Sequence, residues 1–145
     1  NNTLSPITHT GNATNTYLTN NANSVNQYNP NSKSVLWDPS TNKFDLTSLK
    51  VGDIVDITGY ATINNAAAQE FDISISVAEG EATAHEHPVN HNYYKTANAS
   101  SNVVFHHHFI IENAAELAGG ARFRFASVQA ATITVERFSA TVTVV

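Results

Sequence analysis

Hydrophobic and polar residues alternate one by one along most of the chain, which is typical of strands with one buried face. The clearest run covers residues 54–63, and the same period returns at 71–77, 122–125, 132–136 and 140–145. Helical spacing occurs only at 113–117, as one turn that ends at Gly119-Gly120. Short strands separated by turn signals predict an all-β fold, a two-sheet antiparallel sandwich or jelly roll.

Two turns precede the longest run. The apolar segment 35–37 is followed by Asp38-Pro39-Ser40-Thr41-Asn42 and then by Phe44 and Leu46, which predicts a hairpin. A second tight turn is expected at 49–53. We expect a core formed by the apolar positions of these strands: Trp37, Phe44, Val55, Ile57, Phe71, Ile73, Ile75, Phe123, Phe125, Ile133 and Val135.

Residues 1–34 differ from the rest, because 20 of these 34 residues are Asn, Thr or Ser. Such a segment buries little surface by itself. We interpret it as an extended arm, or the lead-in from a stalk, ahead of a jelly-roll domain at 35–145. The apolar residues Tyr17, Leu18, Val25 and Tyr28 favour partial order over a flexible terminus.

Charge is scarce in this chain. Charged residues make up 13% of it, about half the usual share of roughly 25%. A surface covered by Asn, Thr, Ser and Ala is common on fibres and on self-associating proteins. The net charge is −5 and Arg122, Arg124 and Arg137 form no basic stripe, so nucleic-acid binding is not expected. Apolar runs are too short for a membrane span or signal peptide, and without Cys there is no disulfide.

Six of the seven histidines lie between residues 85 and 108. His85 and His87 would point to the same face of a strand, the spacing a metal requires. With His91 they loosely resemble the first motif of the cupins, which implies the alternative of a cupin-like metal enzyme. The spacing from Gly80 is off by one, however, and no second motif follows. We therefore expect no catalytic metal and no cofactor.

The second group, His106-His107-His108, lies inside an apolar strand at 103–111. Its alternating residues put His107 on one face and Val104, His106, His108 and Ile110 on the other. Apolar residues on both faces indicate that both are covered, the outer one by a neighbouring subunit. The alternative is a half-buried strand with ordinary histidines. We expect the terminal strand 140–145 to take part in the same contact. The candidate residues for binding a ligand or forming a homotrimer contact are His106, His107, His108, Val104, Ile110, Val142 and Val144.

Nucleophile and phosphate-binding motifs are missing from the sequence. It has no Gly-x-Ser-x-Gly, no Gly-rich phosphate loop and no Cys. No catalytic residue is therefore assigned, and a binding or assembly module is favoured over an enzyme.

The segment 34–57 resembles the start of the C-terminal domains of bacteriophage tail fibres and tail needles. The resemblance rests on the Trp37 strand, the Asn-containing turn, Leu46-x-x-Leu49-x-x-Gly52-Asp53 and Val55-Asp56-Ile57, and on Tyr93-Tyr94-Lys95-Thr96-Ala97. It implies a homotrimeric jelly roll like that of tumour necrosis factor, on the virion tail and outside the cell. Its role would be to contact a host glycan or outer-membrane component, or to cap the shaft.

Thr58-Gly59 departs from that pattern, in which an Arg often follows the Ile. The histidine groups depart from it as well, so the ligand is left open. A non-viral, adhesin-type trimeric sandwich is the third interpretation.

Overall fold

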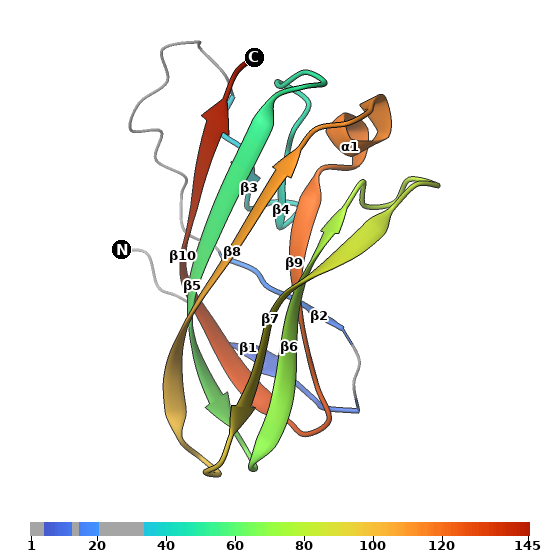
Figure 1. Cartoon of the computed structure of the whole chain (residues 1–145). Coiled ribbons are helices and arrows are strands. Elements are labelled where there is room, and N and C mark those ends of the chain that lie inside the picture. The colour runs from blue at the N-terminus through green and yellow to red at the C-terminus, as the bar shows by residue number, and fades with distance from the viewer. Residues whose placement is uncertain (1–4, 13–14, 21–33) are drawn as a thin grey trace.

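The chain folds into two antiparallel sheets packed face to face, seen in a computed structural model that describes residues 5–12, 15–20 and 34–145 (Figure 1). The first sheet has the order β1-β10-β5-β8 and the second β3-β4-β9-β6-β7, with β2 paired to β9. The bounds are β1 Ile7–His9, β2 Thr16–Tyr17, β3 Trp37–Asp38, β4 Lys43–Phe44, β5 Ile54–Asn65, β6 Gln69–Val77, β7 His85–Tyr94, β8 Ser100–Ile110, α1 Ala114–Gly119, β9 Ala121–Ser127 and β10 Ala131–Thr143.

The strand order is that of a jelly roll. After β5 the chain enters the second sheet for the β6–β7 hairpin and returns to the first sheet as β8. It then crosses again for β9 and ends in the first sheet as β10. Each crossing covers one sheet with the other, which is how this architecture forms a closed core. The predicted two-sheet antiparallel jelly-roll sandwich is confirmed.

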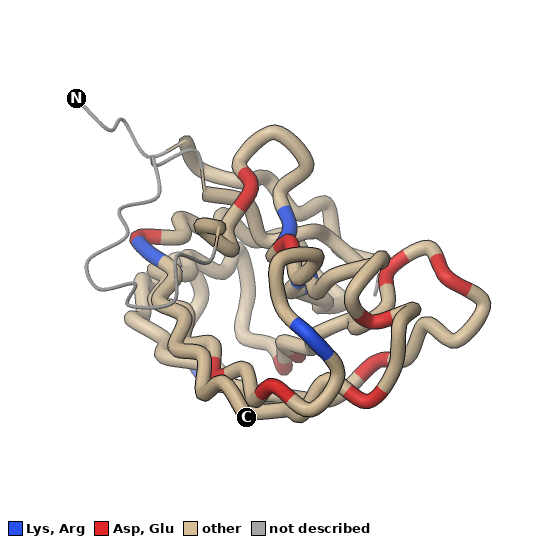
Figure 2. Tube along the Cα trace, turned by 90° about the horizontal axis from the view of Figure 1, so that it is seen from above, with Lys and Arg blue, Asp and Glu red and all other residues tan. Residues whose placement is uncertain are grey.

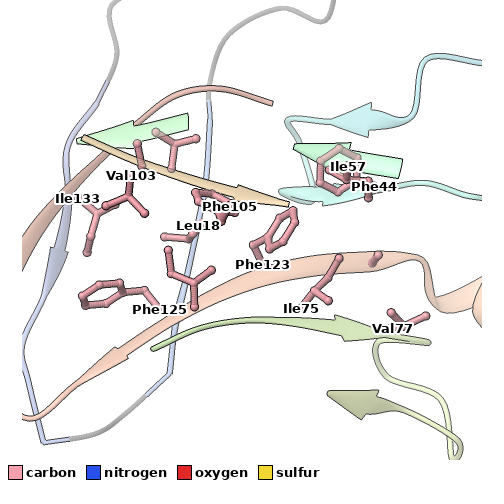
Figure 3. Packing of buried hydrophobic residues seen from close by; sticks show 14 of the residues in the cluster. Leu18, Phe44, Ile57, Ile75, Val77, Val103, Phe105, Phe123, Phe125 and Ile133 are labelled. Carbon is pink, nitrogen blue, oxygen red and sulfur yellow. The ribbon is translucent and has the colours of Figure 1, made fainter. Parts of the chain in front are cut away.

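Alternation along the strands builds the core between the sheets (Figure 3). Every second residue of β5 is buried, and Val55, Ile57 and Ile63 are fully inaccessible to solvent. Phe71 and Phe125 stack on each other in the second sheet, with ring centroids 5.4 Å apart. Burial of each such side chain contributes about 1.5–3 kcal/mol, so the period-two pattern supplies most of the driving force for this fold.

Trp37 is the one predicted core residue that is only half-buried. Its ring packs 5.0 Å from Phe44 and 4.6 Å from Phe138, measured between centroids. Its Nε1–H donates to the carbonyl oxygen of Asn20 at 2.9 Å. Trp37 thus packs against the core as predicted but stays partly exposed, because an indole needs a partner for its N–H and Trp37 finds it at the margin of the sheet.

The turn that carries the Leu-x-x-Leu-x-x-Gly-Asp motif anchors the end of the chain. Leu46 and Leu49 are buried under it, and Gly52 has a φ of +99°, which glycine tolerates best. The buried carboxylate of Asp53 accepts the backbone N–H of Lys50 at 3.0 Å and that of Val145 at 3.2 Å. The motif therefore has a structural role.

Gly59 lies against a core ring of the neighbouring strand. It faces Phe105 on the neighbouring strand β8, and a Cβ at Gly59 would lie 2.1 Å from the Phe105 ring. The ring occupies the space that any side chain at this position would need, so glycine is required by packing.

The described parts of segment 1–34 belong to the sandwich. β1 pairs with β10 and β2 with β9, and Leu18 is fully buried. His9 is also buried, with Nδ1 2.7 Å from the Thr16 hydroxyl and Nε2 3.1 Å from the carbonyl oxygen of Ser127. The predicted anchors Val25 and Tyr28 lie outside the described residues.

The single predicted helical turn is α1. The Asn113 side chain accepts the backbone N–H groups of Ala115 and Glu116 at 3.0 and 3.2 Å, an N-cap, and the helix ends before Gly120 with φ 68°. Across the residues that the structure describes, no helix has the length and apolar character needed to cross a membrane.

Candidate functional site on the two faces of strand β8

Strand β8 forms one edge of the first sheet and presents its two faces to different surroundings. Val103 and Phe105 point into the core, and His107 lies on the same side further along. Val104, His106, His108 and Ile110 lie on the opposite side, which we call the outer face. The predicted alternation of this strand is confirmed.

A carboxylate lies between the two outer histidines. Asp56 on β5 is 2.5 Å from Nε2 of His106 through Oδ1 and 3.4 Å from Nδ1 of His108 through Oδ2. Burial raises the pKa of Asp56, but the hydrogen bonds and charges of the two imidazoles outweigh it and the pKa is lowered. The central part of the outer face thus holds a His-Asp-His group that is half open to solvent.

Apolar side chains flank this group. Val104 is 55% exposed and Ile110 is 52% exposed, at opposite ends of the His-Asp-His group along β8. Tyr60 of β5 lies opposite Val104 and is covered by Arg137 of β10, whose guanidinium is 4.0 Å from the ring centroid. Val104 and Ile110 are two of the exposed large apolar side chains of the described residues.

The structure places some of the predicted contact residues on the outer face of β8 and the others on or after β10. His106, His108, Val104 and Ile110 share the outer face, and β10 lies in the same sheet with β5 between it and β8. Val142, opposite Val55, packs against the core instead. Val144 follows β10 and is 37% exposed.

His107 faces across the sandwich toward β7, the edge strand of the second sheet. The ring centroid of His87 is 5.0 Å from that of His107 and 4.8 Å from that of His85. We call His85, His87 and His107 the histidine trio. Burial, followed by the charges of His87, His106, His108 and His85, lowers the pKa of His107 to about 4.

His91 does not join this trio, contrary to the cupin-like alternative. The pairing of β6 with β7 shifts between Ile73 and Ser74, so that His91 lies opposite Asp72 on the outer side of the second sheet. Its Nδ1 is 2.7 Å from the Asp72 carboxylate, which raises the pKa of His91. The sequence could not indicate His107 in its place, because their proximity arises only when the two sheets stack.

Acidic residues near β7 form an ion-pair network and not a pair of free carboxylates. Arg124 donates to both oxygens of Glu79 at 3.1 and 2.8 Å and to Glu86 at 3.3 Å. The Tyr17 hydroxyl donates to Glu79 at 3.0 Å. Burial raises the pKa of Glu79, yet hydrogen bonds from Ser76 and Tyr17, together with Arg124, lower it on balance. The chain has 7 Lys and Arg against 12 Asp and Glu, and Figure 2 marks both kinds along the described trace.

No model of a known protein family matches the chain, and no curated protein sequence matches it. Two solved structures from Paenibacillus barcinonensis are similar to it. The CBM22-1 xylan-binding domain of Xyn10C is 14% identical over 71% of this chain, with a TM-score of 0.45. The CBM22-2 domain of the same protein is 14% identical over 66%, with a TM-score of 0.39. The chain covers 64% and 67% of these two domains.

Proposed function

We propose that this chain is a non-catalytic binding module that forms the homotrimeric tip of a bacteriophage tail needle or tail fibre. The outer face of the first sheet carries this proposal, because Val104 and Ile110 are more than half exposed there. Other copies of the chain would cover this face. The low charge content of 13% supports assembly, since fewer charges must be desolvated when surfaces meet.

The resemblance to phage tip domains gains support from the position of its motif. The buried Leu46 and Leu49 and the carboxylate of Asp53 fix the start of β5 and the end of the chain together. The start of β5 and the end of the chain lie next to β8 and β10, the strands of the proposed contact. A motif that fixes the interface strands is what a trimeric tip needs.

The ligand class follows from the remaining surface. Asn, Ser and Thr present neutral amides and hydroxyls, which both donate and accept hydrogen bonds, as do the hydroxyls of glycans. We therefore propose a host-surface glycan or outer-membrane component as the partner, contacted from the virion tail outside the cell. The tip would attach to this partner or cap the shaft.

Light scattering after size exclusion, combined with binding of the isolated domain to host glycans and outer-membrane vesicles, tests this function. We expect a trimer at micromolar concentration and saturable binding to one of these surfaces. A monomer overturns the assembly, and a trimer that binds neither surface leaves capping as its role. Turnover of a glycan substrate would overturn the non-catalytic part.

A further inference from the structure

We propose that a hollow at one end of the sandwich binds one neutral sugar residue of the host glycan. The turns that follow β5, β7 and β9 meet at this end, away from Val145 (Figure 1). The backbone N–H of Ala66 in the first turn donates to the carbonyl oxygen of Ala130 in the third at 3.0 Å. This inference rests on the proposed function, whose ligand class it narrows, and it does not depend on the trimer.

The side chains around the hollow suit a sugar. The lining includes the hydroxyls of Thr8 and Thr132, the amides of Asn64 and Asn98, and the methyl groups of three alanines. Hydroxyls and amides both donate and accept hydrogen bonds, as sugar hydroxyls do. The methyl groups offer apolar surface to the C–H face of a sugar ring. No Asp, Glu, Lys or Arg is among the described residues that line the hollow, so the carboxylate of an acidic sugar would lose water there without gaining a cation.

The size of the hollow fits a single ring. Its volume is about 240 Å³, below the roughly 300–1,000 Å³ of pockets for drug-sized ligands. A second hollow of about 400 Å³ lies on the outer side of the second sheet and includes Asp72 and Glu86. These two carboxylates are already paired, Asp72 with His91 and Glu86 with Arg124. A ligand would have to compete with both ion pairs, so we assign the sugar to the smaller, uncharged hollow.

Buried polar side chains hold the turns in place around the hollow. Asn65 is fully buried, and its carbonyl oxygen accepts the backbone N–H of Asn98 at 2.7 Å. Its Oδ1 accepts Nε2–H of Gln69 at 2.8 Å, and Oε1 of Gln69 accepts the backbone N–H of Gln129 at 2.8 Å. Three segments that are far apart in the sequence are thus fixed before a ligand arrives, which lowers the ordering cost of binding.

A donor beside the lining residues is left unpaired. Nδ2 of Asn65, the residue between Asn64 and Ala66, is buried and has no hydrogen-bond partner among the described residues. A buried amide without a partner destabilises the fold. A water that bridges this amide and a sugar hydroxyl would satisfy it, so the unpaired donor is consistent with a polar ligand at this end.

An NMR titration of the ¹⁵N-labelled chain tests the site. The probes are methyl glycosides of neutral hexoses, deoxyhexoses and N-acetylhexosamines, paired with the methyl glycosides of glucuronic and galacturonic acid. We expect saturable shifts of the backbone amide signals of Asn64, Ala66, Asn98 and Ala131 with at least one neutral glycoside, at a Kd on the order of 1 mM. The acidic counterpart of the same ring should bind about tenfold more weakly or less.

Matched variants come from one strand. Thr132→Val removes a hydroxyl of the hollow at nearly constant shape and should weaken binding about 2–10-fold. Thr141→Val makes the same change toward the other end of β10 and should bind as the original chain does. Both threonines are exposed, so the fold is kept. Ala130→Leu, also at an exposed residue, fills the hollow and should abolish the shifts.

The outcomes separate this site from the proposed function. Shifts that map elsewhere, equal binding by Thr132→Val and the original chain, or binding that persists in Ala130→Leu would overturn the hollow as the site and leave glycan binding intact. Equal affinity for neutral and acidic counterparts would overturn the ligand class. A chain that binds no glycoside, no host glycan and no outer-membrane vesicle would overturn both the site and the proposed host-surface binding.

Discussion

Three consecutive histidines in β8 lie in two different environments. His106 and His108 lie on the outer face beside the Asp56 carboxylate, whereas His107 points to the inner side among other imidazoles. The difference follows from the alternation of a strand, which turns neighbouring side chains to opposite sides of the sheet. At the scale of the residue, burial and the neighbouring imidazoles lower the pKa of His107.

This difference predicts a pH dependence for His107. Its pKa is about 4 in the folded state and about 6.5 when unfolded. The unfolded chain therefore binds more protons between these values, and the free energy of unfolding falls as the pH drops through this window. Denaturant titrations of the protein at several pH values, compared with His107→Asn, measure this contribution. We expect the variant to lose less stability in acid.

His91 provides the control for that measurement because its pKa shift has the opposite sign. Asp72 raises the pKa of His91, so its contribution to stability is present in acid and is lost as the pH rises through the folded value. His91→Asn should therefore remove a contribution that is larger at low pH. Identical pH profiles of the original chain and His107→Asn would contradict the assignment for His107.

At the scale of the element, burial of the apolar face of each strand stabilises the fold. β6 is flanked by β7 and β9, and its apolar residues Phe71, Ile73 and Ile75 face the opposite sheet at 0% exposure. Such positions leave a cavity when shortened, because the surrounding strands are held by their own ladders.

Ile73→Ala should lower the free energy of unfolding by about 2–5 kcal/mol. Denaturant titration checks this value. Val128→Ala is the matched control, since Val128 is 64% exposed after β9 and should change stability by less than about 0.5 kcal/mol. Equal effects of the two substitutions would show that Ile73 does not belong to the core.

At the scale of the whole molecule, the exposed apolar residues of β8 define the proposed trimer. Val104 and Ile110 lie in the sheet that also contains the C-terminal strand β10. A contact built on both strands would use two different parts of this sheet in each copy, as the head-to-tail contacts of a closed ring do.

Val104→Lys and Ile110→Lys should each shift the trimer toward monomer, because each would bury a charge without a partner in the contact. Size exclusion with light scattering across a dilution series measures the shift. Val128→Lys places the same charge at a residue that is as exposed but lies outside the proposed contact. A trimer equally resistant to dilution in all three variants would place the contact elsewhere.

The sequence by itself determined most of the long strands, most of the core and the two faces of β8, but not β1 and β2, which lie in the segment interpreted as an arm. Period-two alternation is a local property, and a buried face needs it wherever the strand lies in the sheet. The hairpin at Trp37 and Phe44 and the helical turn at Asn113 were likewise predicted from local turn and capping chemistry.

Only the tertiary structure decided which side chains meet. The space over Gly59 is filled by Phe105, the carboxylate of Asp53 reaches Val145, and His107 joins His85 and His87 while His91 turns away. These contacts depend on strand register, on one bulge and on the stacking of two sheets. No local pattern encodes them, because the partners are far apart in the chain and a shift of one residue reverses the face of every side chain.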